Sequence, residues 1–231
     1  MTAFTVHRPE LTLQVDPGNC TNVQSRAIAE LPLALRVVVN IPDRRARHPR
    51  IIGPGRITHT QLPFALLTHL HWDHVTGLLD RPCRHVQIHA VEHGWAMTGG
   101  VAPGVRSPIQ PAEDLSELDG PPVLTFERSH DLLGDRSVTL VDLAGHTRGS
   151  VGVLLVTPAG YVLLAGDAAW HGIQVKHLRP KTSYPGMLAD SDRAAAFNSL
   201  QPLYAIRETV RVVPPHDHDA VLALNRATDA A

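Results

Sequence analysis

The chain has 231 residues and a formal net charge of −1, and 43% of its residues are hydrophobic. This length fits one domain or two small ones, and the apolar content supports a sizeable core and argues against extensive disorder. The balanced charge argues against nucleic acid as a partner, because binding to phosphates requires a clear basic excess.

The two cysteines and the absence of long apolar runs indicate the cellular setting. Cys20 and Cys83 lie far apart and form no C-x-x-C motif, so the sequence excludes a disulfide framework and favours free thiols. Residues 1–10 contain no apolar signal core, and no segment is long enough to span a membrane. We therefore expect a cytoplasmic protein without a membrane partner, and the sequence leaves room for a homodimer.

The first half of the sequence alternates short apolar runs with polar or Gly/Pro-rich stretches, as expected of strands separated by loops. We expect strands at 11–15, 35–41, 64–68 and 86–90, a short helix at 91–97, and a long loop at 101–122. Loops of this length often border a functional site.

The second half contains three strong apolar runs followed by helical spacing. We expect strands at 137–143, 151–157, 161–165 and 210–213, and helices at 191–209 and 220–227. The turn at 158–160 predicts a hairpin between the second and third strands, and Ser191 is the expected N-cap of the first helix. Strands dominate both halves and helices follow late in each, which predicts two sheets packed face to face with helices outside.

Four potential metal ligands stand in the six residues 69–74, where the sequence reads H-L-H-W-D-H. The apolar run before them predicts a buried strand that ends in a loop, with His69 and His71 turned the same way because side chains alternate along a strand. Two histidines can then hold one metal and leave Asp73 and His74 for a second.

Three further candidate ligands, His146, Asp167 and His216, each come just after a predicted strand. Glycine or proline stands beside each of them and leaves space for a turn. Strand ends at one edge of a sheet can converge on one point, so these residues are candidates to complete a two-metal site.

The motifs H-x-H-x-D-H at 69–74, G-H-T-x-G-S at 145–150, G-D-A at 166–168 and P-H-D at 215–217 together resemble the metallo-β-lactamase superfamily. The turn at 131–137 is similar to the D-L-x-G-D-G-S turn of its lactonase-like hydrolases. The resemblance covers the chain from about Thr58 and implies an α/β fold, a four-layer αββα sandwich of two mixed β-sheets flanked by helices. It implies a single domain over residues 1–231, with a divergent N-terminal part at 1–57.

The resemblance also implies the roles of the seven ligands. It places His69, His71 and His146 on one metal, Asp73, His74 and His216 on the other, and Asp167 between the two. Ligands of imidazole and carboxylate without thiolate suit two zinc ions, with iron, manganese or cobalt as alternatives.

The activity implied is hydrolysis of a small-molecule ester or lactone, including substrates similar to acyl-homoserine lactones. A hydroxide that bridges the metals would attack the carbonyl, and Asp73 would be catalytic because it orients that hydroxide and carries its proton.

Two departures from the family pattern affect these expectations. The early hairpin that usually ends in D-T-G has no such motif near 51–55. Trp170 stands where the lactonases commonly carry a tyrosine that donates to the substrate carbonyl, and an indole N–H can donate a hydrogen bond but cannot transfer a proton. Trp72 and Trp170 are therefore candidates for an apolar wall of the substrate pocket, with simple packing as the alternative for Trp170.

Other activities of the superfamily remain open. A glyoxalase II-like thioester hydrolase usually adds a basic helical region after the last ligand, whereas only 15 residues follow His216 here. A persulfide dioxygenase-like oxidoreductase would bind a single iron, so metal analysis separates it from a dizinc hydrolase. A metal-binding module without activity is a further alternative.

Overall fold

Residues 1–8, 11–26, 28, 36, 62–100, 113–183 and 189–228 are described by the computed structural model. They form two units, Met1–Ile88 with His93–Leu115 and His89–Glu92 with Ser116–Ala231, which are described in turn. The expectation of one domain over 1–231 with a divergent part at 1–57 stays a prediction.

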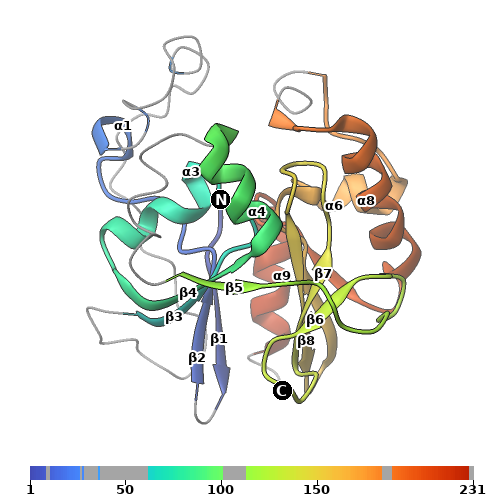
Figure 1. Cartoon of the computed structure of the whole chain (residues 1–231). Coiled ribbons are helices and arrows are strands. Elements are labelled where there is room, and N and C mark those ends of the chain that lie inside the picture. Colours follow the sequence, from blue (N-terminus) through green and yellow to red (C-terminus); the bar gives the residue numbers. More distant parts are fainter. Residues whose placement is uncertain are drawn as a thin grey trace. The chain divides into compact units, whose positions relative to one another are not determined.

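The first sheet has five strands, in the order β1-β2-β3-β4-β5 (Figure 1). β1 and β2 are antiparallel, whereas β2, β3 and β4 run parallel to one another. The bounds of these strands are β1 Phe4–Arg8, β2 Leu11–Val15, β3 Leu62–Leu66, β4 Cys83–His89 and β5 Glu113–Ser116.

The inner strands of this sheet carry buried residues on both faces, as expected of parallel strands inside an α/β fold. Leu13 and Leu66 are buried on one face, and Ala65 and Val86 belong to a core cluster on the other. Short helices lie between the strands: α1 Val23–Arg26, α3 Trp72–Val75 with a 3-10 turn at Thr76–Leu79, and α4 Ala90–Trp95 with a π-helical turn at Ala96–Gly100.

The second sheet has the order β10-β9-β8-β7-β6, and all neighbours are antiparallel except β9 and β10. The predicted hairpin is confirmed, because β8 and β9 pair with Thr157 opposite Gly160. The bounds of these strands are β6 Ser129–Asp131, β7 Val138–Asp142, β8 Val151–Thr157, β9 Gly160–Leu164 and β10 Arg211–Val213.

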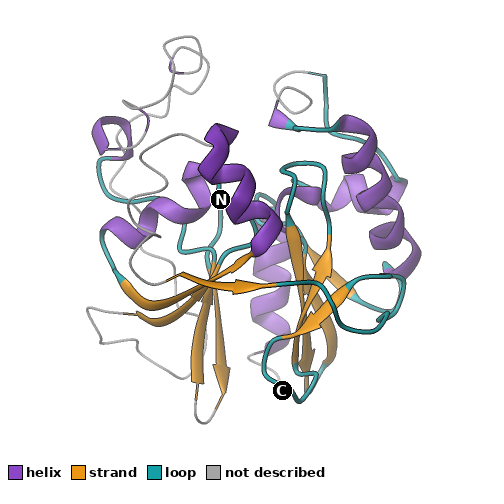
Figure 2. Cartoon of the chain, in the orientation of Figure 1, coloured by secondary structure: helices purple, strands orange, loops and turns teal. Residues whose placement is uncertain are grey.

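Helices α6 (Gly172–His177) and α8 (Arg193–Ile206) pack on one face of this sheet (Figure 2). Helix α9 (His218–Thr228) is the last described element. Leu200 and Leu203 of α8 share a buried cluster with Leu154 and Leu163 of the sheet. The opposite face carries a second buried row, Leu140, Val153 and Leu164. Burial on both faces is typical of a sheet inside a layered α/β fold.

The structure corrects several of the predicted boundaries. The strands at 11–15 and 151–157 are confirmed, and the strand at 35–41 lies outside the described residues except for Arg36. The predicted loop at 101–122 is wrong in its described part, since it contains β5. The N-cap of α8 is Asp192 rather than Ser191, because the Asp192 carboxylate accepts from the N–H of Ala195 at 3.0 Å.

Candidate metal centre

The first group of predicted ligands follows β3 directly. His69 and His71 lie in the connection after the strand, and α3 begins at Trp72, so Asp73 and His74 stand on a helical turn rather than in the predicted loop. The turn forms because the N–H of His74 donates to the carbonyl oxygen of His71 at 3.0 Å. This corrects the local geometry and leaves the four candidates on one short segment.

The rings of this segment lie close to one another. The centroids of His69 and His71 are 4.9 Å apart, and those of His69 and His74 are 4.0 Å apart. Asp73 Oδ2 lies 3.8 Å from His74 Nε2. His69 and His74 are fully buried, and buried imidazoles packed this tightly are the pattern expected of metal ligands.

Asp16, at the end of β2, positions His74. Its Oδ2 lies 2.8 Å from His74 Nδ1, and its Oδ1 accepts from the N–H of Thr68 at 2.8 Å. A ligating histidine commonly donates its second ring N–H to a carboxylate in this way, which turns Nε2 toward the metal. Nδ1 of His74 is therefore engaged by Asp16, and Nε2 is the candidate ligand atom.

The same carboxylate acts on His69 through Thr68. The Thr68 hydroxyl donates to Asp16 Oδ2 at 2.7 Å, and its oxygen lies 3.1 Å from His69 Nδ1. Because the hydroxyl proton is directed to Asp16, the oxygen accepts from Nδ1–H of His69. His69 Nε2 is then the atom with a lone pair for a metal.

Sequence reasoning missed Asp16. The resemblance predicts an aspartate at the end of an early hairpin and places this end near 51–55, which lies outside the described residues. The β1–β2 hairpin ends instead in Asp16-Pro17-Gly18. An acidic residue directly after a predicted strand and before a Pro-Gly turn was the signal that could have identified it.

The second group, His146, Asp167 and His216, converges on one carboxylate. His146 follows β7, Asp167 lies in a 3-10 turn after β9, and His216 follows β10. Asp167 Oδ2 lies 3.3 Å from His146 Nε2, and Oδ1 lies 3.2 Å from His216 Nε2. Each oxygen of Asp167 thus faces a different imidazole, which is the arrangement expected of a carboxylate between two metals.

The loop that carries His146 is held in place by buried polar contacts. The N–H of Gly149 donates to Glu92 Oε2 at 3.0 Å, and its carbonyl oxygen lies 2.9 Å from His89 Nδ1. Within the loop, the hydroxyl oxygens of Thr147 and Ser150 are 2.6 Å apart. Residues of the motif G-H-T-x-G-S therefore hold the backbone around His146 as well as including this candidate ligand.

Burial lowers the pKa of His146, and the nearby carboxylates of Asp190 and Asp167 offset this in part. Its side chain is only 1% exposed. The imidazole is consequently neutral near pH 7, which is the form a metal ligand requires.

The indole N–H of Trp170 donates a hydrogen bond to the candidate ligand Asp167. The distance from Nε1 to Asp167 Oδ2 is 2.7 Å, and the ring lies between those of His146 and His216, with centroid distances of 6.4 and 5.9 Å. Trp72 is partly buried against two apolar clusters. The assignment of both tryptophans to a substrate pocket stays a prediction.

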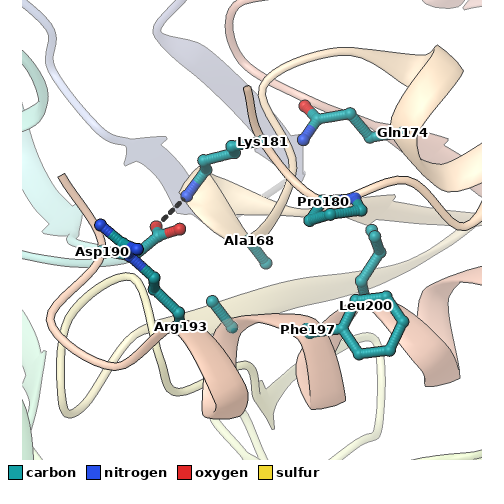
Figure 3. A pocket seen from close by; sticks show the side chains of 9 residues that line it. Ala168, Gln174, Pro180, Lys181, Asp190, Arg193, Phe197 and Leu200 are labelled. Carbon is teal, nitrogen blue, oxygen red and sulfur yellow. Dashed lines mark hydrogen bonds and ion pairs between the residues drawn. The ribbon is translucent and has the colours of Figure 1, made fainter. Parts of the chain in front are cut away.

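A pocket lies between α8 and the segments that carry Ala168 and Pro180 (Figure 3). Phe197 and Leu200 supply an apolar side, and Lys181, Asp190 and Arg193 supply a charged one. The ammonium of Lys181 forms an ion pair with Asp190.

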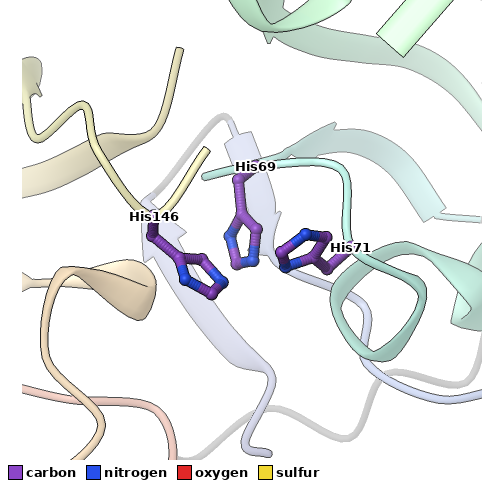
Figure 4. Close-up of side chains that lie close together, drawn as sticks. All are labelled: His69, His71 and His146. Carbon is purple, nitrogen blue, oxygen red and sulfur yellow. The ribbon is translucent and has the colours of Figure 1, made fainter. Parts of the chain in front are cut away.

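The donor set fits divalent metal ions. Figure 4 draws three of the imidazoles, His69 and His71 from the segment after β3 and His146 from the loop after β7. The seven predicted ligands comprise five imidazoles and two carboxylates, the donors that zinc and similar ions prefer.

Among the described residues, no helix has the length and apolar character needed to cross a membrane.

Two mixed sheets with helices and a histidine–aspartate ligand set define an α/β metalloprotein. Residues 57–221 match the metallo-β-lactamase superfamily, and the chain belongs to this family. The predicted fold class and the resemblance drawn from the four motifs are thereby confirmed.

Known relatives and structures resemble the chain at different levels. Probable metallo-hydrolases of Mycobacterium bovis and Mycobacterium tuberculosis are each 32% identical over 117 residues, which is 46% of this chain and 36% of the relative. The chain thus spans about a third of the length of these curated relatives.

Among solved structures, a mutant of AiiA from B. thuringiensis with N-decanoyl-L-homoserine at its active site is 18% identical. It has a TM-score of 0.60 over 96% of this chain and 82% of its own. An N-acyl homoserine lactone hydrolase with its product N-hexanoyl-L-homoserine at the catalytic metal centre is 16% identical, with a TM-score of 0.63 over 96% of this chain and 82% of that one. At these identities the likeness establishes a common fold.

Proposed function

We propose that the chain is a dinuclear metal-dependent hydrolase of esters or lactones. The observation that carries the proposal is the position of Asp167, whose two oxygens face His146 and His216 separately. In the proposed centre Asp167 would be shared by two metal ions. His69, His71 and His146 would hold the first ion, and Asp73, His74 and His216 would hold the second.

Zinc is the proposed metal, because imidazole and carboxylate donors without thiolate suit it. Two such ions, when bound, supply a hydroxide near neutral pH and Lewis acidity for a carbonyl oxygen. Family membership and the buried, oriented imidazoles of His69, His74 and His146 support this assignment.

The residues of the chain orient the donors and handle the proton. Asp16 and Thr68 contact Nδ1 of His74 and His69, so that Nε2 would be the metal-binding atom of each ring, and Trp170 holds Asp167 through its indole N–H. Asp73 is half-buried, and its Oδ2 lies beside His74 Nε2, so it is placed to accept a proton from the attacking water.

A small lactone, similar to an acyl-homoserine lactone, is the proposed substrate class. The fold shared with lactonase structures and the turn at 131–137 support it. Because the N–H of Trp170 is directed to Asp167 Oδ2, the substrate carbonyl would depend on the metals rather than on this residue. The net charge of −1 supports a small molecule rather than nucleic acid as the partner.

The test combines metal analysis with a hydrolase panel. We expect two zinc ions per chain and turnover of at least one member of a panel of short- and long-chain lactones, esters and thioesters. Asp167→Ala should lose both metal and rate. One iron per chain would instead favour the dioxygenase, and two bound metals without any turnover would favour a binding module.

A further inference from the structure

We infer that Asp190 is a positioning residue for His146, which keeps the imidazole proton on Nδ1, and that Lys181 holds Asp190 in place. The inference rests on the proposed function, since it treats His146 as a metal ligand through Nε2. Neither residue belongs to any of the four sequence motifs.

Two buried charged groups, from Asp190 and Lys181, lie against Nδ1 of the buried His146 ring. Asp190 Oδ1 lies 2.9 Å from Nδ1, Lys181 Nζ lies 3.0 Å from it, and Lys181 forms an ion pair with the same Asp190 oxygen (Figure 3). The three side chains are between 1% and 6% exposed. Because these side chains have little access to water, the neighbouring protein groups determine which ring nitrogen of His146 carries the proton.

Two arrangements of the proton compete there. In the first, Nδ1–H of His146 donates to Asp190, and Nε2 keeps its lone pair. In the second, the ammonium of Lys181 donates to a bare Nδ1, and the proton sits on Nε2, where it faces Asp167 Oδ2 at 3.3 Å. Only the first arrangement lets Nε2 bind a metal.

Other contacts favour the first arrangement. The charged carboxylate of Asp190 is a stronger acceptor for the Lys181 ammonium than a neutral imidazole nitrogen, and the ammonium lies 5.2 Å from the centroid of the Trp170 ring, in a cation–π position. Asp167 Oδ2 already accepts from the N–H of Trp170, so it does not need a proton from His146. Asp190 is therefore left as the acceptor for Nδ1–H.

Lys181 is required because Asp190 is buried. A buried carboxylate without a counter-charge is costly, and a lysine at hydrogen-bonding distance compensates it. Lys181 contacts both Asp190 and the face of Trp170, which itself donates to Asp167. Asp190 and Lys181 thus connect Nδ1 of His146 to Trp170, which donates to Asp167.

The test compares Asp190→Ala with a matched control, Asp192→Ala. Asp192 lies two residues further along, is exposed, and caps α8 without an observed contact to His146. Nitrogen-15 chemical shifts of the imidazole report the tautomer in metal-free protein at one alkaline pH. We expect the Nδ1–H form in the native protein and in Asp192→Ala, and the Nε2–H form in Asp190→Ala.

Zinc affinity, measured by competition with a chelator, gives the second readout. Loss of an outer partner of a ligating histidine typically lowers metal affinity about 10–100-fold. We expect a loss of this size in Asp190→Ala and native affinity in Asp192→Ala. An unchanged tautomer together with unchanged affinity in Asp190→Ala would overturn the inference.

Two further outcomes remain decisive. If Asp190→Ala does not fold, Asp190→Asn replaces it, and we expect a mixture of both tautomers because an amide can accept from or donate to Nδ1. A pure Nδ1–H signal in that variant would contradict the role of the carboxylate. If the native protein binds no metal, the proposed function fails, whereas the tautomer of metal-free His146 still tests Asp190.

Discussion

Asp16 and His74 are 58 positions apart in the sequence, yet Asp16 Oδ2 lies 2.8 Å from His74 Nδ1 in the buried interior of the first unit. The residue that directly follows β2 thus controls the orientation of a candidate ligand on α3. The same carboxylate serves Thr68 and, through it, His69.

Asp16→Ala should lower both metal affinity and stability. It leaves buried donors on Thr68 and His74 without their acceptor, at about 1–3 kcal/mol for each, and it releases the His74 ring. Chelator competition and urea unfolding measure the two effects. Asp114→Ala is the matched control, because Asp114 pairs with His85 at the surface, where such pairs contribute little. Equal losses in both variants would contradict the role of Asp16.

Trp170→Phe should weaken metal binding while it keeps an aromatic ring at this position. The change removes the N–H that donates to Asp167 Oδ2, together with the five-membered ring that carries it. A hydrogen bond to a charged group contributes about 1.5–3 kcal/mol, so we expect a loss of roughly 10–100-fold in metal affinity. Tyr161→Phe, an exposed aromatic on β9, serves as the control. Native affinity in Trp170→Phe would show that Asp167 does not depend on this bond.

Gly145→Ala should destabilise the protein by more than Gly160→Ala. Both glycines have positive φ, +133° and +107°, so both substitutions strain the backbone by about 1–3 kcal/mol. A Cβ at Gly145 would also lie 2.1 Å from the nitrogen of Ala196, whereas a Cβ at Gly160 meets nothing within 4 Å. Urea midpoints give the difference, and equal midpoints would argue against close packing of the His146 loop on α8.

Asp80 should make the stability depend on pH in the acid range. Burial raises its pKa, but the backbone N–H of Thr21 and the guanidinium of Arg26 outweigh this and lower it below the usual value. A lowered pKa contributes stability above the unfolded-state value, about 3.9, and this stability is lost as the pH falls through the folded-state pKa. Asp80→Asn should therefore be less stable than the native protein at pH 7, and the two should converge in acid. Urea unfolding at several pH values measures both stabilities, and a stability difference that does not change with pH would refute this prediction.

Cys83 should react slowly with iodoacetamide. Burial raises its pKa to about 12, against a smaller opposing effect of Arg81. The thiolate is the reactive form, so at pH 8 we expect alkylation roughly 10³-fold slower than that of a free cysteine with a pKa of about 8.5. Urea-unfolded protein, in which both thiols are accessible, provides the reference rate. Rapid alkylation of the folded protein would contradict the burial of this thiol.

The sequence predicted the seven candidate ligands because they lie in short motifs beside strong strands. Their supports were not predictable in the same way, since Asp16 and Asp190 reach His74 and His146 across 58 and 44 positions. The edge strands β1 and β6 were missed because they are short and carry polar residues such as His7 and His130. The Pro-Gly turn after Asp16 marks that residue locally, but no local pattern shows which distant histidine each of these carboxylates contacts.

The two groups of ligands differ in how much of the chain they need. His69, His71, Asp73 and His74 belong to one stretch of six residues, whereas His146, Asp167 and His216 are brought together by three separate strand ends. The first stretch is consequently a chelator even in an unfolded chain, because no long loop has to close. Metal bound to the unfolded chain stabilises that state too. Metal therefore increases the free energy of unfolding by less than its affinity for the native protein implies.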